Sequence, residues 1–297
     1  MSSSPLRIGL LGFGHLGQFI HEHWQKEAVQ SKHDFELVFI WNRTKDIFAN
    51  YDHPLRQELI VSTIEEGLQR QPELVVEVAH PDIVERYAEQ ILDVCDLFIG
   101  SPTALAHAPL EALLRRKSAT SGRAIYIGAG AFWGAEDIVK MNERNTLRSL
   151  TITMKKHPDS FKLNEPLHSK LVDERKKLGD QQSEILVYAG PVRDLCRWAP
   201  NNVNTMAIGA TVASHLGFDG VQGRLIADAS LIDRHVVEIE LTGPTTTIDD
   251  QNIVEFHVKT TRTNPAPVGV VTGTATLLSF ISSIKRAKGH TTGIHVV

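Results

Sequence analysis

One stretch near the N-terminus decides the fold: Arg7-Ile8-Gly9-Leu10-Leu11-Gly12-Phe13-Gly14-His15-Leu16-Gly17-Gln18. Its apolar run ends in three glycines spaced Gly-x-Gly-x-x-Gly, and an amphipathic segment follows from Leu16 to about Ala28. A strand, a glycine turn and a helix in this order are typical of a site that binds a dinucleotide.

The three glycines have separate tasks in such a turn. Gly12 permits the sharp bend out of the strand, Gly14 lets the backbone approach a pyrophosphate, and Gly17 lets the helix pack closely on the strand. The helix N-terminus, with His15 and Leu16, offers free N–H groups and the positive end of the helix dipole to phosphates. We expect these five residues to bind a nicotinamide nucleotide, with the His15 side chain pointing outward. An ordinary strand-to-helix turn is the alternative.

The predicted second strand, Phe35 to Trp41, is followed by Asn42-Arg43-Thr44. An NAD-specific site usually has Asp or Glu near this point, where the carboxylate binds the ribose 2′-hydroxyl. Asn42 carries no charge, and Arg43 can meet a 2′-phosphate. The sequence therefore predicts that NADP is accepted, alone or alongside NAD, and that Asn42, Arg43 and Thr44 contact it. A solvated arginine in a surface turn is the alternative.

The rest of the N-terminal half alternates apolar strands with helical patterns, which predicts a parallel, doubly wound sheet. Further strands are expected at residues 58–61, 73–79, 96–101 and 124–128. Ligands of such sheets lie beyond the carboxyl ends of the strands, which places Ala79, His80, Ser101 and residues 128–131 on the nicotinamide side. His80 can also cap the next helix. Glu77, inside a buried strand, should be paired or protonated.

The second half has a different pattern, because its strands alternate apolar and polar residues as in an antiparallel sheet with one buried face. We expect strands at 147–155, 184–188, 223–227, 235–241 and 253–260, and helices at 199–216 and 273–286. The Lys-rich segment 159–182 is typical of an exposed excursion or a mobile loop.

The predicted fold class is therefore α/β: an N-terminal Rossmann domain with a doubly wound parallel sheet, then an α+β domain with a mostly antiparallel sheet. We place the dinucleotide-binding domain at 1–133 and the substrate domain at 134–267. The last helix, at about 268–290, is expected to pack back on the first domain.

The composition is that of an ordinary globular protein, 42% hydrophobic and 22% charged, with a net charge of −4 over 297 residues. It has no Lys/Arg block and no apolar run of about 20 residues, so neither nucleic acid nor a membrane is an expected partner. The start, Met1 to Pro5, lacks the features of a signal peptide. Cys95 and Cys196 have no metal-binding or redox spacing. We therefore expect a cytoplasmic protein without a metal site.

Three segments of the second half resemble motifs of the L-aspartate dehydrogenase family, in the family's order. Residues 128–137, GAGAFWGAED, resemble its S-G-A-x-x-G segment. Residues 188–204 contain YAGP and then PNNVN, similar to its F-x-G-x-A segment and P-x-N-x-N helix start. Residues 232–239, IDRHVVEI, are similar to its N-x-H-E-I strand. Val236 replaces the usual Glu, and Thr205-Met206 also depart from the bacterial and archaeal pattern, so the chain resembles the animal branch.

The resemblance implies oxidation of L-aspartate to iminoaspartate by NAD or NADP. Iminoaspartate then hydrolyses to oxaloacetate and ammonia, or it enters quinolinate synthesis and so NAD biosynthesis. Hydride transfer from Cα requires a deprotonated amine, so a base that titrates near neutral pH should lie beside the substrate. His235 matches the family's catalytic histidine and is expected to be this acid–base residue. A lone histidine is otherwise more often structural.

The other matched residues are expected to hold the two ligands. The resemblance assigns Asn204 to the cofactor and Asn202 to the substrate, although asparagine is also a common helix cap. Ala131 is expected to line the cofactor pocket through its backbone, where a larger side chain would not fit. Lys156, in a segment similar to the family's R-K-P-P, can attract a dicarboxylate by its charge. A solvated lysine at a strand end is the alternative.

Two other classes of protein stay open from the sequence. One is another Rossmann dehydrogenase of amino or hydroxy acids. Its sugar-oxidising type is disfavoured, because Gly100-Ser101-Pro102 stands where that type has Glu-Lys-Pro. The other is a non-catalytic NADP-binding sensor or scaffold, which Val236 weakly favours and the retained His235 opposes. The family also implies a homodimer acting on a small-molecule substrate.

Overall fold

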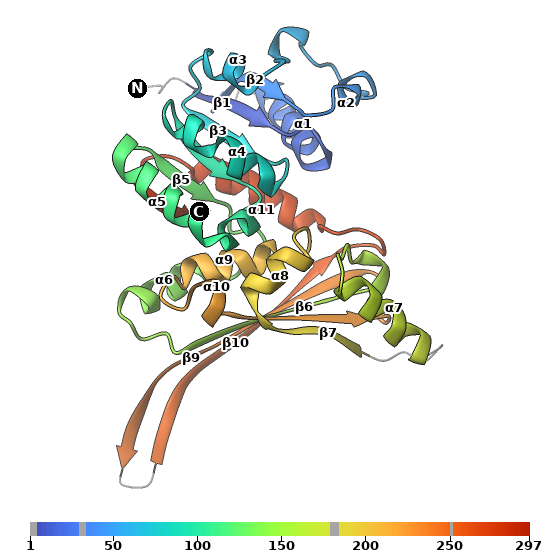
Figure 1. Ribbon diagram of the computed structural model, residues 1–297, viewed down its shortest axis with the longest axis vertical. Coiled ribbons are helices and arrows are strands. Elements are labelled where there is room, and N and C mark those ends of the chain that lie inside the picture. Colours follow the sequence, from blue (N-terminus) through green and yellow to red (C-terminus); the bar gives the residue numbers. More distant parts are fainter. Residues whose placement is uncertain (1–4, 30–33, 179–183, 250–251) are drawn as a thin grey trace. The chain divides into compact units, whose positions relative to one another are not determined.

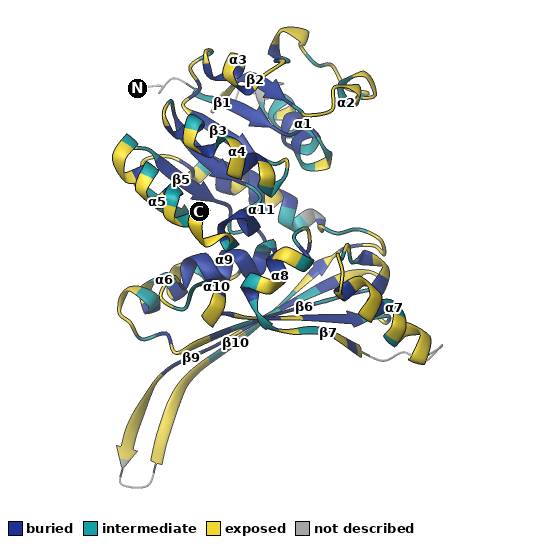
Figure 2. Cartoon of the chain, viewed as in Figure 1, coloured by how far each residue is buried: buried dark blue, intermediate teal, exposed yellow. Residues whose placement is uncertain are grey.

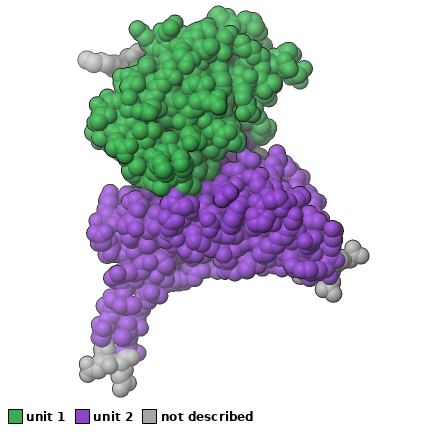
Figure 3. All heavy atoms as spheres, in the orientation of Figure 1, with its two compact units in different colours: residues 1–128, 280–297 green, residues 129–279 purple. Residues whose placement is uncertain are grey.

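The computed structural model describes residues 5–29, 34–178, 184–249 and 252–297, and it forms two compact units (Figures 1 and 3). Unit 1 comprises residues 1–128 and 280–297, and unit 2 comprises residues 129–279. The sequence analysis places the boundary between a dinucleotide-binding domain and a substrate domain at residue 133. This boundary and the two roles stay predictions. Residues 1–4, part of the segment compared with a signal peptide, lie outside the described residues. Among the described helices, none has the length and apolar character needed to cross a membrane.

Unit 1 is built on a six-stranded parallel sheet with the order β11-β5-β4-β3-β1-β2 (Figure 1). The strands are β1 (Leu6–Leu11), β2 (Phe35–Trp41), β3 (Leu74–Glu77), β4 (Asp96–Ile99), β5 (Ala124–Ile127) and β11 (Gly293–Val296). Because β2 and β3 lie on opposite sides of β1, the strand order reverses there. Ligands of doubly wound sheets bind at such a switch point, beyond the carboxyl ends of the strands.

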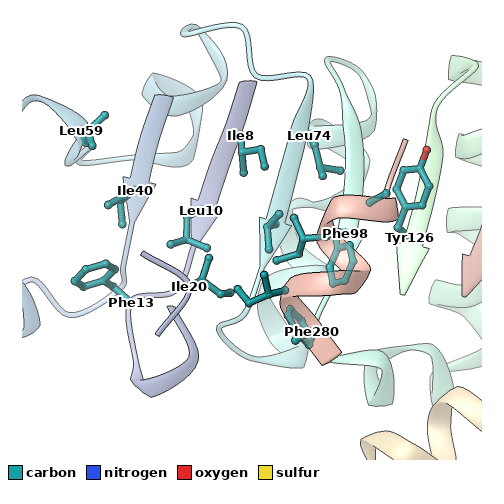
Figure 4. Close-up of a cluster of buried hydrophobic side chains, with 14 of the residues drawn as sticks. Ile8, Leu10, Phe13, Ile20, Ile40, Leu59, Leu74, Phe98, Tyr126 and Phe280 are labelled. Atoms are coloured by element: carbon teal, nitrogen blue, oxygen red, sulfur yellow. The ribbon is translucent and has the colours of Figure 1, made fainter. Parts of the chain in front are cut away.

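Helices connect these strands, as the alternating pattern predicts. They are α1 (His15–Val29), α2 (Asp46–Ala49), α3 (Ile64–Leu68), α4 (Pro81–Leu92) and α5 (Ala108–Ser121), with short 3-10 helices at Gln57–Leu59 and Pro102–Ala106. The core packs apolar side chains of the sheet against α1 and α11 (Thr274–Arg286); Figure 4 shows Ile8, Leu10, Phe98 and Phe280 in it. Only residues 280–286 of α11 belong to unit 1.

One expectation for unit 1 is wrong, and one strand was not expected. Residues 58–61 form no strand; they include the end of a 3-10 helix and make a single bridge between Ile40 and Ile60. The sixth strand is instead β11, which pairs with β5. The segment 58–61 is apolar because Leu59 and Val61 are buried against the sheet, and burial alone does not require a strand.

Unit 2 contains a five-stranded sheet with the order β10-β9-β6-β8-β7. The strands are β6 (Ser149–Lys156), β7 (Glu184–Pro191), β8 (Gln222–Asp228), β9 (Arg234–Asp249) and β10 (Asn252–Pro265). All neighbouring pairs are antiparallel except β6 with β8, so the prediction of a mostly antiparallel sheet is confirmed. The far part of the β9–β10 ribbon extends beyond β6 and is exposed (Figure 2).

The helices of unit 2 are α6 (Ala135–Glu143), α7 (Leu167–Leu178), α8 (Val192–Trp198), α9 (Asn204–Val212) and α10 (Gly217–Gly220), with a 3-10 helix at Pro158–Ser160. Residues 205–212 of α9 are all buried, as expected for a helix without a polar face. A side chain at Gly209 would collide with Ile152 of β6, so this glycine lets α9 lie close to the sheet.

Two expectations for unit 2 also need correction. The segment 159–182 contains α7, which buries Leu167 and Leu171, so it is not a loop throughout; residues 179–182 lie outside the described residues. The helix expected at 199–216 begins at Asn204 and ends at Val212, and its N-cap, Val203, makes no side-chain cap. Neither Asn202 nor Asn204 is therefore the capping residue.

Candidate active site

The glycine turn lies between β1 and α1, and its three glycines differ in what surrounds them. A Cβ atom at Gly12, whose φ is +103°, would lie 2.8 Å from the backbone of Ala79. A Cβ at Gly17 would lie 2.2 Å from the carbonyl oxygen of Gly12. A Cβ at Gly14 would meet no atom within 4 Å, so open space faces this residue at the start of α1. Gly12 and Gly17 are required by the chain itself, whereas no neighbouring atom requires a glycine at position 14.

Asn42 connects the end of β2 to the glycine turn. Its Oδ1 accepts a hydrogen bond from the Phe13 backbone N–H at 2.9 Å, and its Nδ2 donates to the Thr44 carbonyl oxygen at 2.6 Å. Arg43 and His15 are both exposed, as predicted for His15. Asn42 therefore holds the turn in shape, and the Arg43 guanidinium is available to a ligand.

Ala79, His80 and Ser101 meet around one buried side chain, Glu77 at the end of β3. Its carboxylate accepts hydrogen bonds from the Ala79 N–H at 2.7 Å, the Ser101 N–H at 3.1 Å and the Ser101 hydroxyl at 3.0 Å. Burial raises the pKa of Glu77 to about 7, and these hydrogen bonds, with one from the His80 backbone, oppose the rise. The prediction that Glu77 is paired or protonated is confirmed.

His80 itself caps α4. It is the N-cap residue, and its Nδ1 accepts a hydrogen bond from the Asp82 N–H at 3.3 Å. Because the ring lies at the helix start, its described contacts are structural, in agreement with one of the two roles expected for it.

In unit 2, three polar residues form a row across neighbouring strands. The register of β6 and β9 pairs Met154 with Val237, and the next positions on the same face are Lys156 and His235. On the other side of β9, His235 pairs with Asn264 of β10. These side chains continue the buried apolar stripe of the sheet, with relative exposures of 2% for Lys156, 5% for His235 and 3% for Asn264. We call Lys156, His235 and Asn264 the polar row.

His235 is neutral and has one free ring nitrogen. Burial and, to a smaller extent, the neighbouring Lys156 charge lower its pKa to about 4, and a hydrogen bond with the Val270 backbone partly opposes them. The hydrogen bond with Val270 raises the pKa of His235, so it stabilises the protonated ring. The ring is therefore the donor, and the Val270 carbonyl oxygen is the acceptor. Because Nε2 has no hydrogen-bond partner among the described residues, the donor is Nδ1. The histidine therefore offers an unprotonated Nε2, and its pKa is lower than the neutral-range value expected from the sequence.

Lys156 is buried without a carboxylate. Its Nζ donates to the Val271 carbonyl oxygen at 2.9 Å and lies 6.0 Å from the centre of the Phe161 ring. Burial lowers the pKa of this lysine to about 7. The prediction of a solvated lysine is wrong, because the residue belongs to the buried face of β6.

The loop after β10 binds the side chains of both His235 and Lys156, because the backbone carbonyls of Val270 and Val271 accept their hydrogen bonds. It is fastened by two hydrogen bonds, from the Gly269 N–H to the Ser160 hydroxyl and from the Ala266 N–H to the Asp233 carbonyl oxygen. The imidazole and the amine are thus oriented before any ligand binds.

Two buried amide side chains also have unpaired carbonyl oxygens. Asn202 donates from Nδ2 to the Lys162 carbonyl oxygen at 2.6 Å, but its Oδ1 has no partner in the described residues. The Oδ1 of Asn264 is likewise without a partner there. Asn264 was not expected from the sequence; its place opposite His235 in the β9–β10 hairpin is the signal that identifies it. Since buried polar atoms are nearly always hydrogen-bonded, each of these oxygens and the His235 Nε2 can accept a hydrogen bond from a bound ligand or a water molecule.

Comparison with known proteins agrees with both units. Residues 12–128 match a family model described as the NAD binding domain of homoserine dehydrogenase, and residues 137–287 match one described as the C-terminal part of aspartate dehydrogenase. An aspartate dehydrogenase domain-containing protein of Xenopus tropicalis is 45% identical over 285 residues, which cover 96% of this chain and 95% of the relative. The chain belongs to the aspartate dehydrogenase family.

Other relatives of this aspartate dehydrogenase family member support the assignment. An L-aspartate dehydrogenase of Archaeoglobus fulgidus is 27% identical over 80% of this chain and 82% of the relative. The crystal structure of aspartate dehydrogenase from Thermotoga maritima has the same fold, with a TM-score of 0.64 and 17% identity over 96% of this chain and 97% of that one. The chain is therefore a nicotinamide-dependent amino acid dehydrogenase, an oxidoreductase with a Rossmann unit.

The remaining motif residues of this family member lie in unit 2. Ala131 is buried, and the adjacent Gly130 accepts a hydrogen bond from the Arg262 guanidinium at 3.1 Å through its carbonyl oxygen. Asn204 is the first residue of α9 and is partly buried. In the described residues, no cluster of His, Cys, Asp and Glu could hold a metal ion.

Proposed function

We propose that the protein oxidises L-aspartate to iminoaspartate with NADP or NAD, and that His235 is the acid–base residue. Two observations support this: membership of the aspartate dehydrogenase family and the polar row of unit 2. The row is the observation that carries the proposal, because buried groups without partners are costly unless a ligand completes their hydrogen bonds.

The cofactor is proposed to contact the glycine turn and the other motif residues. The residues proposed to bind it are Gly12, Gly14, His15, Leu16, Gly17, Asn42, Arg43, Thr44, Ala79, His80, Ser101, Ala131 and Asn204. When bound, the nicotinamide accepts the hydride from the substrate Cα. The exposed guanidinium of Arg43, beside an uncharged Asn42 where an NAD-specific site usually has Asp or Glu, supports the acceptance of NADP.

The substrate is proposed to lie on the polar row, with Asn202 and Lys156 among its contacts. His235 supports proton transfer, because its Nδ1 is tied to the Val270 carbonyl and its Nε2 lone pair is free. A pKa of about 4 keeps the imidazole neutral, and therefore able to take a proton, throughout the physiological pH range.

The replacement at Val236 does not argue for a protein that has lost turnover. Successive residues of a strand point to opposite faces, so Val236 points away from the face that holds His235. It pairs with Lys155 on β6 and with Thr263 on β10, and it is partly exposed. The substitution thus leaves the polar row intact, which supports an active enzyme over a sensor or scaffold.

We also infer that the enzyme works in the cytoplasm as a homodimer on a small-molecule substrate. The family resemblance supports the dimer, and the absence of a Lys/Arg block in the sequence supports a small acidic substrate over nucleic acid.

An assay of the purified protein tests the function. The protein is mixed with NADP or NAD and with L-aspartate, D-aspartate, L-glutamate, L-alanine or L-malate, and the absorbance of the reduced nicotinamide is followed. We expect reduction with L-aspartate and far slower reduction with the other compounds. A preference for L-malate would identify a hydroxy-acid dehydrogenase, and no reduction with any compound would contradict the proposal.

A further inference from the structure

Two consecutive lysines at the end of β6 have opposite surroundings. Lys155 lies on the outer face, where its Nζ is 3.0 Å from a carboxylate oxygen of Glu184 and 3.7 Å from one of Glu238. Interaction with these carboxylates and with Asp228 raises the pKa of Lys155. Lys156 lies on the buried face, where its Nζ donates to the Val271 carbonyl oxygen. Among the described residues, Glu184, Glu238 and Asp228 interact with Lys155, and no carboxylate pairs with Lys156.

We propose that Lys156 is a second catalytic base, whose neutral amine removes the proton from the ammonium group of the bound amino acid. The inference rests on the proposed function and deepens it, because it separates two proton transfers that a single histidine would otherwise perform. It also changes the role expected for Lys156 from a charged anchor for a carboxylate to a proton acceptor.

The polar row matches an ammonium group in hydrogen-bonding capacity. An ammonium has three N–H donors and no acceptor. The row presents the Nε2 of His235 and the Oδ1 of Asn264, both without partners in the described residues, beside the Nζ of Lys156. A neutral lysine contributes the third lone pair. A protonated lysine would instead place a second ammonium against the substrate's own.

The basicity of the two groups also favours this division. The ammonium group of a free amino acid is a weak acid, so the stronger of the two neighbouring bases removes its proton at the smaller cost, and His235, with a pKa of about 4, is the weaker base. Lys156, whose burial lowers its pKa to about 7, is the stronger base of the two and keeps a neutral amine above that pH.

Few other charges face Lys156. The loop residues 266–273 and helix α9 contain no titratable group. β9 contributes His235, and β10 contributes Arg262, which donates to the Gly130 carbonyl oxygen. Asp228, next to the Ala227 that pairs with Lys156 on β8, interacts with Lys155. Beyond the strand end, the carboxylate of Asp159 pairs with His157 and Arg175.

The proposed step balances as follows. One N–H bond of the substrate ammonium breaks and one N–H bond forms at Lys156 Nζ. The Cα–H bond then breaks and its electron pair leaves as hydride to the bound NADP or NAD, while the nitrogen lone pair forms the C=N bond. Lys156 returns its proton to solvent before the next turnover. His235, the weaker base, is left to take a proton from the water that adds to the imine carbon.

A titration of the ligand-free protein tests the basicity without any substrate. Lysine side chains are labelled with ¹³C at Cε, and the Lys156 signal is assigned by its loss in Lys156→Met. We expect Lys156 to titrate near neutral pH, whereas Lys155, assigned by Lys155→Met, titrates above the usual lysine range. A Lys156 that stays protonated at pH 9 would overturn the inference.

Steady-state kinetics tests the role. A proton acceptor cannot be replaced by a fixed charge, so Lys156→Met and Lys156→Arg should both lose about 10²–10⁴-fold in kcat. The matched control, Lys155→Met, should stay close to the wild-type rate. If Lys156→Arg keeps most of its turnover and Lys156→Met mainly raises KM for L-aspartate, Lys156 is a carboxylate anchor and the inference is wrong.

The pH profile separates the two bases. In the wild type, kcat/KM should rise with pH to a plateau above about 7, as Lys156 loses its proton. This rise should persist at a lower rate in His235→Gln and vanish in Lys156→Met, provided that both variants melt as cooperatively as the wild type. The opposite pattern would overturn the inference. A wild type that oxidises no L-aspartate would overturn the proposed function instead, whatever the lysine titration shows.

Discussion

The two units bury polar groups in opposite ways. In unit 1, the Glu77 carboxylate is fully enclosed, and donors from Ala79, His80 and Ser101 surround it. In unit 2, the polar row is equally buried, yet the Nε2 of His235 and the Oδ1 of Asn264 have no partner in the described residues. The first arrangement is complete without a ligand, and the second is not.

The difference separates a structural site from a chemical one. A satisfied buried carboxylate fixes the ends of β3 and β4, which support the predicted cofactor side of unit 1. An unsatisfied donor or acceptor costs roughly 1–3 kcal/mol in the folded state, and this cost is offset only when a ligand supplies the missing hydrogen bond. Stability and function should therefore respond oppositely to substitutions in the two places.

The largest effect is expected at His235. A positioned base contributes about 10²–10⁴-fold to turnover, so His235→Gln should lower kcat on L-aspartate by about that factor, although glutamine keeps a hydrogen-bonding group. Cofactor affinity and melting temperature should change little, because Nε2 has no structural partner to lose. Kinetics and a thermal melt measure both. A glutamine variant with most of its turnover would show that His235 is a ligand or a structural residue.

At Glu77 the loss should appear in stability. Glu77→Ala leaves several buried donors without an acceptor, so the free energy of unfolding should fall by about 2–4 kcal/mol in chemical denaturation. The control is Glu58→Ala, because Glu58 is exposed and its ion pair with Arg56, 3.7 Å long, should contribute about 0–1 kcal/mol. Equal losses of unfolding free energy in Glu77→Ala and Glu58→Ala would show that the buried Glu77 carboxylate contributes no more than an exposed one.

Arg43 offers a test of unit 1 that leaves its buried groups untouched. Loss of a charge-assisted contact to the 2′-phosphate should weaken NADP binding by about 1.5–3 kcal/mol in Arg43→Ala and leave NAD binding nearly unchanged. Calorimetric titration with each cofactor measures the difference. Equal losses for both cofactors, or no loss, would exclude this role.

Lys156 should show the cost of burying a positive charge directly. Its pKa is about 7 in the folded chain against an ordinary 10.5, so the unfolded chain binds more protons between these pH values. The penalty is thus fully present below pH 7 and disappears as the pH rises to about 10.5. Lys156→Met should be more stable than the wild type by about 1–3 kcal/mol at pH 6, with the gain shrinking at pH 10.

The control for this measurement is Lys155→Met. Its lysine is partly exposed and paired with carboxylates, so its removal should change stability by less than about 1 kcal/mol and slightly lower it. A gain in Lys155→Met as large as in Lys156→Met would contradict the account of the row.

Most of the fold follows from local sequence patterns. The glycine turn and the alternation of strands and helices predict unit 1, because each signal lies within one strand-turn-helix segment. Strand β11 could not be predicted, since four residues near the C-terminus become a strand only by pairing with β5. Helix α7 was missed because its buried residues are few: Leu167 and Leu171, one helical turn apart, are both buried in an otherwise polar segment.

The site was predictable only where a motif marks it. His235 and Lys156 were expected from their segments, but Asn264 becomes visible only through the β9–β10 register, which no local pattern specifies. The low pKa of His235 could not be predicted either, because it depends on burial and on a lysine from another strand. Sequence patterns indicate the residue types of the row, and only the fold gives their environment.

The most direct test of the central claim follows the hydrogen on Cα. L-Aspartate carrying deuterium at Cα is incubated with the protein and NADP, and the reduced cofactor and the products are analysed by mass spectrometry. We predict reduced cofactor that carries the deuterium, and oxaloacetate and ammonia formed in equal amounts to it. Reduced cofactor without deuterium, or deuterated L-aspartate recovered unchanged while another amino acid is oxidised, would contradict the account.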